Sequence, residues 1–472
     1  MSTPPSGRPA GRKLRPLVIA TLVSTLGGFL FGYDNIVISG AIGYLTRFFE
    51  LDVAQTGWAA GCALLGCLIG SAGAGALVDR LGCKRGLALC AACFALSSAG
   101  IWFAGSLTEF VAWRMVGGLG IGGASIVAPM YIAEIAPTRV RGRLVTLYQL
   151  GIVLGIFSAV FVNMLIQRLG DEAWNTGLGW RWMFAAGVVP ALLFGAMIVP
   201  ALESPRWLLK MGRRAQAEAV LDRIHGIQAG AAESHSIRAS LETEQGRLSE
   251  LFTTGFRRAL LIGVLLAGLS QMSGITPLFS FLPEVFQAAG AGTADAFEQS
   301  VLVSLINTVF TLVALWLVDL AGRRTLILAG TLVQCASFAA VGWLYHVQAS
   351  GTGVLVFVMS FVAAHAVGNG AVCWVILSEI FPTKVRGRAM SIATTSLWLF
   401  AYLGNQLFPL LRERLGSDGT FWCFSAAALV NFLCVLLLVP ETRGRSLEEI
   451  ETLWTRTQVR TVAGSSRALE RE

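Results

Sequence analysis

Long apolar stretches alternate with short polar connections along almost the whole chain. A helix needs about 20 mainly apolar residues to cross the hydrocarbon core of a bilayer. Because backbone groups that face lipid must be hydrogen-bonded within their own element, each stretch of that length is predicted to be a transmembrane helix. Twelve stretches qualify, namely residues 17–45, 56–78, 86–106, 108–133, 144–167, 181–201, 256–288, 299–318, 325–346, 353–378, 389–411 and 421–439.

Composition points to the same class. Charged residues make up 14% of the chain and apolar residues 55%, whereas soluble domains carry roughly 25% charged residues. The nine cysteines show neither metal-ligand spacing nor a disulfide framework, and we find no nucleophile motif or phosphate loop. We therefore expect a lipid bilayer around the protein, with no enzyme activity, no cofactor, no metal and no nucleic-acid partner.

The basic residues are distributed unevenly between the two sides of the predicted bundle. Of the 36 lysines and arginines, thirty fall in the tails and connections of one side, and Arg114 lies inside a span. Since cytoplasmic connections are enriched in Lys and Arg, that side is predicted to be cytoplasmic. We expect a multi-pass protein of the plasma (inner) membrane with both termini in the cytoplasm. The opposite side carries five basic residues: Arg47, Arg168, Arg181, Arg412 and Arg414.

Three connections recur between the two halves of the chain. AEIAPTRVRGR from Ala133 matches SEIFPTKVRGR from Ser378, and DRLGCKR from Asp79 matches DLAGRR from Asp319. A weaker third match pairs PALESPR from Pro200 with PETRGR from Pro440, and all three are offset by 240 to 245 residues. These matches predict an all-α membrane protein of two parallel six-helix bundles, with a solute site near mid-membrane between them.

The repeat and the polarity of the connections divide the chain into five parts, and we expect the whole to be a monomer. The polar stretch between the halves has helical spacing and is predicted to be a small cytoplasmic helical domain. The predicted parts are a cytoplasmic tail (1–16), the N-terminal bundle (17–202), the linker domain (203–255), the C-terminal bundle (256–440) and a second cytoplasmic tail (441–472).

Six motifs follow one another from about residue 20 to 455: GYDNIVISGA, WRMVGGLGIG, PMYIAEIAPTRVRG, LESPRWL, SEIFPTKVRG and PETRGRSLEEIE. In this combination the chain resembles the sugar porters of the major facilitator superfamily, and bacterial sugar–proton symporters in particular. The resemblance implies proton-coupled uptake of a sugar or related polyhydroxylated solute by alternating access. An uncoupled sugar or polyol carrier is the alternative. A transporter-like nutrient receptor is a third, but such receptors usually carry a longer tail than the thirty or so residues after Pro440.

Asp34 and Arg114 are the two charges that fall clearly inside spans. An ionised group at the bilayer centre costs at least about 2.5–3.5 kcal/mol, so it points to function. We predict that they pair, and that protonation of Asp34 from outside frees Arg114 and changes the packing of the first and fourth spans. The resemblance implies the same role, because symporters of the family carry Asp in the GYD motif. The alternative is a static ion pair. His365 is a third titratable candidate, although a lone buried histidine is more often structural.

The seventh span is interrupted by Gly274, Pro277 and Pro283, and broken spans of this kind commonly line solute sites. Amides, hydroxyls and an indole in the spans offer the neutral hydrogen-bonding groups and the flat apolar surface that a sugar needs. Gln149 and Gln271 also coincide with sugar contacts of the family. The alternative for all of them is hydrogen bonding between helices. The predicted solute-binding residues are Gln149, Ser270, Gln271, Thr276, Asn369 and Trp398, with Ser280 as a further candidate.

Several of these positions depart from the family pattern QQxxGINxxxYY. Ser270 replaces the first Gln, Thr276 the Asn, and Ser280 and Phe281 the Tyr pair. Other departures are Asn369 for the usual Trp, Ala371 for Pro and Leu397 for a polar residue. They favour a solute other than a common hexose or pentose, such as a polyol, cyclitol, glycoside or hydroxylated acid.

Charged residues at the inner ends of the spans resemble the cytoplasmic gate of the family. Opposite charges there can pair across the halves when the protein faces outward and separate when it faces inward. They also set topology, and Cys83 replaces a usual basic residue. The predicted gate residues are Asp79, Arg80, Arg85, Glu134, Arg141, Glu203, Asp319, Arg323, Arg324, Glu379, Arg386, Glu441 and Arg443, beside which Arg206 also lies.

Overall fold

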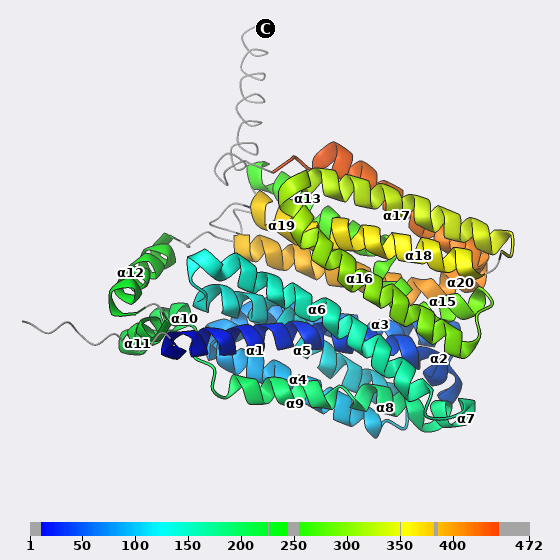
Figure 1. The fold of residues 1–472 in the computed structure, drawn as a ribbon, viewed down its shortest axis with the longest axis horizontal. Coiled ribbons are helices and arrows are strands. Elements are labelled where there is room, and N and C mark those ends of the chain that lie inside the picture. The colour runs from blue at the N-terminus through cyan, green and yellow to red at the C-terminus, as the bar shows by residue number, and fades with distance from the viewer. Residues whose placement is uncertain (1–10, 225, 244–253, 350, 382–385, 443–472) are drawn as a thin grey trace, which may run out of the picture.

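The computed structural model describes residues 11–442, except 225, 244–253, 350 and 382–385. Within these residues, eleven helical segments are long and apolar enough to cross a membrane. The last of them, Gly387–Leu438, holds two spans because Gly416 (φ 73°, ψ 176°) interrupts it. The prediction of a twelve-helix membrane bundle is therefore confirmed, and Figure 1 shows the helices running side by side.

Six spans form the first half. α1 and α2 together make the first span, and α7 to α9 with the π-helical turn η1 make the sixth. Local capping fixes where two helices begin: Asp52 accepts a hydrogen bond from the backbone N–H of Gln55, and Ser106 from that of Glu109. The elements are α1 (Gly11–Ile36), α2 (Ile38–Phe48), α3 (Val53–Leu81), α4 (Cys83–Trp102), α5 (Leu107–Ile135), α6 (Thr138–Gln167), α7 (Glu172–Trp174), η1 (Asn175–Gly179), α8 (Trp180–Ala185) and α9 (Val188–Ile198).

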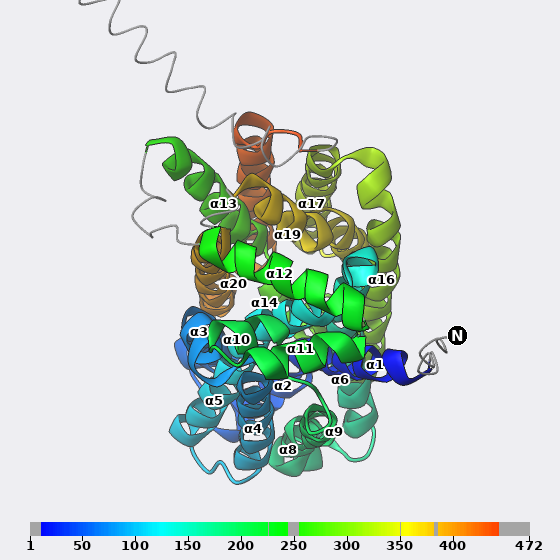
Figure 2. The same cartoon turned by 90° about the vertical axis from the view of Figure 1, so that its left-hand side faces the viewer.

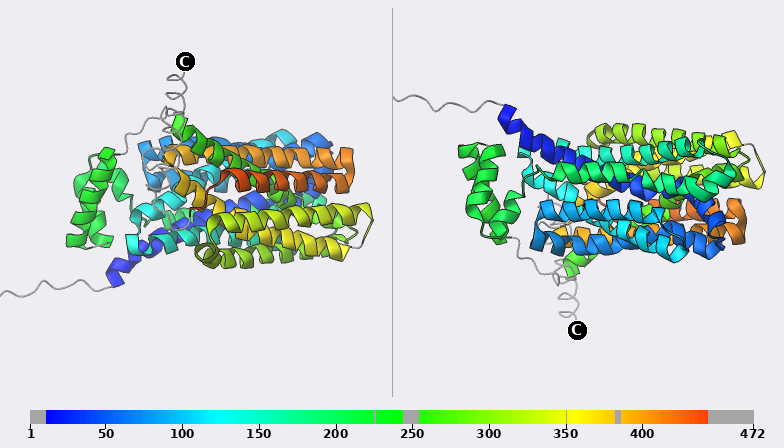
Figure 3. Two further views of the ribbon diagram at one scale, coloured as in Figure 1. Left: turned by 90° about the horizontal axis from the view of Figure 1, so that it is seen from above. Right: turned by 90° about the horizontal axis from the view of Figure 1, so that it is seen from below.

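Three helices of the linker follow, α10 (Pro205–Lys210), α11 (Arg214–Ile224) and α12 (Ile227–Thr243). Ser204 caps α10, and Pro205 occupies its first turn, where no backbone N–H is needed. The linker helices lie across one end of the bundle (Figures 2 and 3), at which α1 also begins. We call this end the linker end and the opposite one the far end.

The second half repeats the arrangement, with breaks in two spans. Gly274 (φ 96°) separates α13 from α14 in the seventh span, and the π-helical turn η3 interrupts the tenth. The elements are α13 (Thr254–Met272), α14 (Ile275–Ser280), α15 (Leu282–Ala288), α16 (Thr293–Ala321), α17 (Arg323–His346), α18 (Gly351–His365), η3 (Ala366–Gly370), α19 (Ala371–Ile380) and α20 (Arg386–Leu438).

Glycines let the helices of the first half approach at backbone distance. A Cβ on Gly118 of α5 would lie 2.1 Å from the carbonyl oxygen of Ala63 on α3. Likewise, a Cβ on Gly32 of α1 would lie 2.0 Å from the carbonyl oxygen of Ile152 on α6. Small residues of this kind favour close packing of membrane helices, where van der Waals contact drives association. These contacts pack α5 against α3 and α1 against α6, and α1 and α5 carry the two intramembrane charges.

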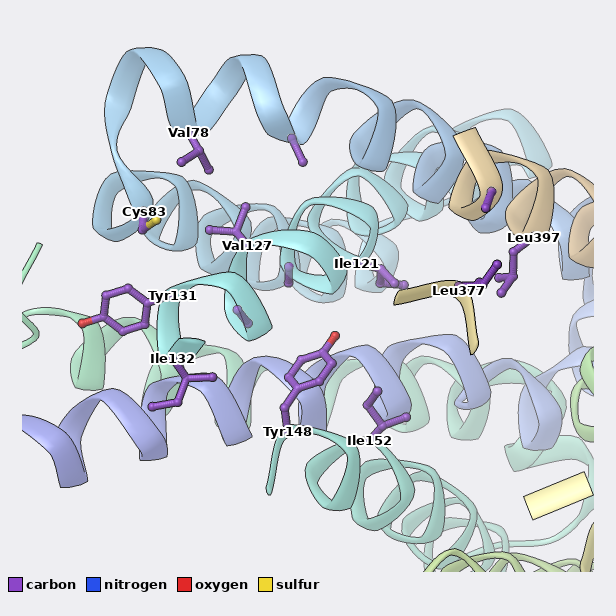
Figure 4. Packing of buried hydrophobic residues seen from close by; sticks show 14 of the residues in the cluster. Val78, Cys83, Ile121, Val127, Tyr131, Ile132, Tyr148, Ile152, Leu377 and Leu397 are labelled. Carbon is purple, nitrogen blue, oxygen red and sulfur yellow. The ribbon is translucent and has the colours of Figure 1, made fainter. Parts of the chain in front are cut away.

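Buried apolar side chains of the described residues form two clusters, and each runs from the first half into the second. Figure 4 shows Tyr148 and Ile152 of α6 in the first cluster, together with Leu377 of α19 and Leu397 of α20. Tyr131 of α5 belongs to the same cluster and is fully buried. The two halves therefore share a common apolar core, and the buried polar side chains of the spans are surrounded by it.

Candidate functional site

Asp34 of α1 and Arg114 of α5 form a buried ion pair. Arg114 Nη1 lies 3.1 Å from Asp34 Oδ2, and the side chains are 1% and 6% exposed for Arg114 and Asp34. The same Nη1 donates to the backbone carbonyl oxygen of Asp34 at 3.0 Å. The structure thus brings together the two charges that the sequence placed in separate spans, while their coupling role stays a prediction.

The surroundings of this pair are tight and mostly apolar. The Arg114 guanidinium lies 5.2 Å from the centre of the Phe184 ring. A Cβ on Gly117 would lie 3.1 Å from Asp34 Oδ2 and 2.6 Å from Ser97 Oγ. Because so little room is left around the carboxylate, a change in its charge must move the guanidinium or the helices themselves.

The break in the seventh span organises a second group of predicted residues. Thr276 Oγ1 donates to Gln271 Oε1 at 2.6 Å across the break. Both side chains are half-buried, so each keeps some open surface. Ser270 is turned differently, since its hydroxyl donates to the backbone carbonyl oxygen of Ala267 in its own helix at 2.7 Å.

The remaining predicted solute-binding residues lie on other spans. Asn369, in η3, donates to Gln334 of α17 at 3.4 Å and is buried. Trp398 of α20 is also buried and packs edge-on against Phe31 of the first half, with ring centres 5.6 Å apart. Gln149 of α6 is half-buried.

At the far end, hydrogen bonds join the two halves directly. Asn405 of α20 donates to the backbone carbonyl oxygen of Ala60 on α3 at 3.2 Å, and to Ser280 at 3.0 Å. Gln406 donates to the carbonyl oxygen of Ala54 at 3.0 Å. The far end is therefore held shut between α3 and α20.

Outside this contact the far end opens into a cavity of about 610 Å³, lined by both halves. An ion pair between Arg168 and Glu298 joins the halves at this end. Arg47 and Glu172, which are paired at 2.8 Å, lie on the cavity wall. The cavity lining comprises Gly43, Thr46, Arg47, Leu51, Val53, Thr56, Glu172, Phe281, Glu284, Gln287, Thr293, Phe408, Pro409, Arg412 and Glu413.

At the linker end, the described contacts of the first-half gate residues are made within that half and with the linker. Asp79 pairs with Lys210 of α10 at 2.7 Å. Glu203 accepts from the backbone N–H of Lys84 at 3.0 Å, beside Gly82, whose φ is 88°. Glu134 accepts from the Ser204 hydroxyl and, at 3.6 Å, from the Cys83 thiol.

The second half repeats this arrangement with one difference. Glu441 accepts from the backbone N–H groups of Arg323 and Arg324, both at 3.2 Å, as Glu203 does from Lys84. Arg323 Nε lies 3.5 Å from Glu379. At the corresponding place in the first half, Cys83 faces Glu134, so a thiol takes the place of a guanidinium.

Of the other predicted gate residues, one pairs with the linker, two are exposed, and three lie wholly or partly outside the described residues. Arg141 pairs with Glu233 of α12 at 3.9 Å, which ties the linker to the first half. Arg80 and Arg85 are exposed. The side chains of Asp319 and Arg386, and the whole of Arg443, lie outside the described residues.

Two buried amides of the site were not among the predicted residues. Asn405 connects the halves at the far end, and Gln334 contacts Asn369. Both are polar residues within apolar spans, which is the same signal that selected Gln149 and Gln271. The partner of each amide could not be predicted from the sequence, because the partners lie on helices distant in the chain.

Known proteins resemble this chain along nearly its full length. The family described as "Sugar (and other) transporter" matches residues 20–454. The chain is 37% identical over 440 residues to the arabinose-proton symporter of Bacillus subtilis, covering 93% of this chain and 95% of the relative. It is 36% identical over 466 residues to the D-xylose-proton symporter of Escherichia coli, with 92% and 95% covered. The structure matches the partially occluded, inward-open xylose transporter of E. coli with a TM-score of 0.84 at 34% identity, covering 92% of this chain and all of that one.

Proposed function

Because the chain belongs to the sugar (and other) transporter family, we propose that it is a proton-coupled symporter that carries a sugar or related polyhydroxylated solute across the membrane by alternating access. The observation that carries this proposal is the buried ion pair of Asp34 and Arg114. The printed names of two relatives, an arabinose-proton and a D-xylose-proton symporter, support it.

Proton coupling follows from the chemistry of the pair. While Asp34 is ionised, Arg114 binds it and draws α5 toward α1. A proton on Asp34 removes the ionic attraction, and the guanidinium then keeps only its bond to the Asp34 carbonyl oxygen. A shift in the packing of the two helices can in this way be linked to proton binding, since a ligand moves an equilibrium only through its different affinity for two states.

Solute binding is assigned to neutral groups near the break of the seventh span. Gln271, Thr276 and Gln149 present amide and hydroxyl groups with some open surface. Asn369 and Trp398 belong to the same proposed set. Ser270 is included because it directly precedes Gln271 in the helix. Uncharged donors and acceptors of this kind match hydroxyl groups, so a neutral polyhydroxylated solute fits better than an ionic one.

We also propose which side of the membrane the closed end of the bundle faces. The contacts of Asn405 and Gln406 hold the halves together at the far end. We assign the linker end, with its excess of basic residues, to the cytoplasm of a bacterial-type inner membrane. The described state is then closed to the outside. The gate residues at the linker end, which here pair within halves and with the linker, would pair across the halves in the opposite state.

The test is uptake by the purified protein in proteoliposomes. Radiolabelled D-xylose, L-arabinose, D-galactose, D-glucose, myo-inositol, D-mannitol and a methyl galactoside are offered with and without an imposed pH gradient, acidic outside. We expect at least one of them to accumulate above its equilibrium level only when the gradient is present. Uptake that merely equilibrates under both conditions would instead identify an uncoupled carrier, and no uptake of any solute would contradict transport of this class.

A further inference from the structure

Two buried amide side chains meet inside the second half, and a buried histidine lies four residues before one of them in the chain. Gln334 of α17, His365 of α18 and Asn369 of η3 are 0%, 8% and 2% exposed. Asn369 Nδ2 donates to Gln334 Oε1 at 3.4 Å. Among the described residues, Gln334 Nε2, Asn369 Oδ1 and His365 Nδ1 have no hydrogen-bond partner. One donor and one acceptor of the amide pair are thus left unused side by side.

Backbone contact between two spans brings the amides together. A Cβ on Gly330 of α17 would lie 2.8 Å from the carbonyl oxygen of Ala364 and 3.0 Å from Gly368 Cα. The helices can approach this closely only because both Gly330 and Gly368 lack side chains. The tenth span is π-helical at Ala366–Gly370, and such turns are frequent at functional sites.

The amide pair lies one helical turn from the aromatic layer that supports the break in the seventh span. Phe338, four residues after Gln334, stacks on Phe361 with ring centres 3.7 Å apart. A Cβ on Gly274, the residue of the break, would lie 2.9 Å from the rings of both Phe338 and Phe424. The unused donor and acceptor are therefore close to the segment that carries Gln271 and Thr276.

A hydrogen bond that only joins two helices does not account for the unused donor and acceptor. A buried polar group whose hydrogen bond is not made is costly, and natural proteins keep few of them. Two apolar side chains would join α17 to η3 without that cost. A hydroxyl group, which both donates and accepts, would satisfy Gln334 Nε2 and Asn369 Oδ1 together.

We infer that Gln334 is a specificity-determining residue, which together with Asn369 binds one hydroxyl group of the transported solute. The inference rests on the proposed function, because it names a contact within the same transport site. Gln334 Nε2 donates to the hydroxyl oxygen, and the hydroxyl proton is donated to Asn369 Oδ1. The pair thereby selects solutes that carry a hydroxyl at this position over analogues that lack it.

The experiment compares Gln334→Leu with wild type in proteoliposomes. The probe is whichever solute of the uptake panel above is taken up, in competition with its singly deoxygenated analogues. We expect wild type to bind one analogue about 10-fold more weakly than the parent, as loss of one buried hydrogen bond implies. In Gln334→Leu that ratio should fall toward one, with a similar rise in KM for the parent solute.

The matched control is Thr331→Val on the same helix. The Thr331 hydroxyl is equally buried but donates to the carbonyl oxygen of Ile327 at 2.7 Å, so its loss should leave the ratios unchanged. Gln334→Met, of the same length, serves as second variant should Gln334→Leu fold poorly. Wild-type ratios in a folded Gln334 variant would overturn the inference alone, whereas a wild-type protein that transports none of the probes would overturn the proposed function and this contact with it.

Discussion

Arg114 Nη1 is bonded at once to the carboxylate of Asp34, at 3.1 Å, and to the carbonyl oxygen of the same residue, at 3.0 Å. One guanidinium therefore holds both the side chain and the backbone of α1 at this point. The two bonds respond differently to a proton. The ionic bond weakens when Asp34 is protonated, whereas the carbonyl bond stays. Such a contact can loosen α1 from α5 without detaching it.

Replacing Asp34 by Asn should separate solute exchange from solute accumulation. Asn keeps the size of the side chain but carries no titratable proton, so the variant should exchange labelled for unlabelled solute and lose accumulation driven by a pH gradient. Both are measured in proteoliposomes as counterflow and as gradient-driven uptake. Asp52→Asn is the control, because Asp52 is exposed and caps α3, a role that Asn fills equally well. Accumulation that survives in Asp34→Asn would make the ion pair a structural one.

Gln271→Leu should weaken solute binding without changing the pH dependence of transport. The substitution removes the amide to which Thr276 donates and, with it, a proposed contact to the solute. Loss of one hydrogen bond to a neutral ligand is expected to raise KM about 10-fold. Ser273→Ala provides the comparison, because the Ser273 hydroxyl is buried and bonded to the carbonyl oxygen of Ser270 in its own segment. A KM that is equal in both variants would remove Gln271 from the site.

Asn405→Ala should open the far end more than Glu298→Gln. The Asn405 bond to Ala60 is buried, so its loss is expected to shift the balance between the two states by about 10-fold. The pair of Arg168 and Glu298 is half exposed, and such a pair is worth about 0–1 kcal/mol, or no more than about fivefold.

The shift is read as a distance between spin labels on Val53 and Thr293, which line the outer cavity from opposite halves. A longer distance should gain population in Asn405→Ala. If Glu298→Gln had the larger effect, the closure would depend on exposed charge rather than on the buried amide.

Two glycines of α3 should differ sharply when changed to alanine. A Cβ on Gly70 would lie 2.4 Å from the carbonyl oxygen of Leu119 on α5, whereas a Cβ on Gly73 has nothing within 4 Å. Overpacking costs about 1–3 kcal/mol, so Gly70→Ala should lower the melting temperature of the purified protein. Gly73→Ala should not lower it, since alanine favours a helix by about 1 kcal/mol over glycine. Equal melting temperatures would show that α3 and α5 are not in backbone contact.

Much of the frame could be predicted from the sequence, because hydropathy and the repeat are local properties of the chain. The break at Gly274 was visible as an interruption of an apolar run, and the structure gives that residue a left-handed backbone. The exchange of a basic residue for Cys83 was visible too. That Glu134 then turns to Ser204 as well as to Cys83 could not be seen, because Ser204 lies 70 residues further along the chain.

The sequence by itself determined that the chain crosses the membrane as helices and that two charges lie inside them, because a run of about 20 apolar residues satisfies its own backbone hydrogen bonds in a bilayer as a helix. Only the tertiary structure decided which residues meet. Asp34 and Arg114 are 80 residues apart, and Ala60 and Asn405 are 345 apart. Their contacts depend on how closely the helices approach, and that distance is set by side-chain shape at many positions together. The absence of a Cβ at residues such as Gly32 and Gly118 acquires its meaning only when the facing helix is in place.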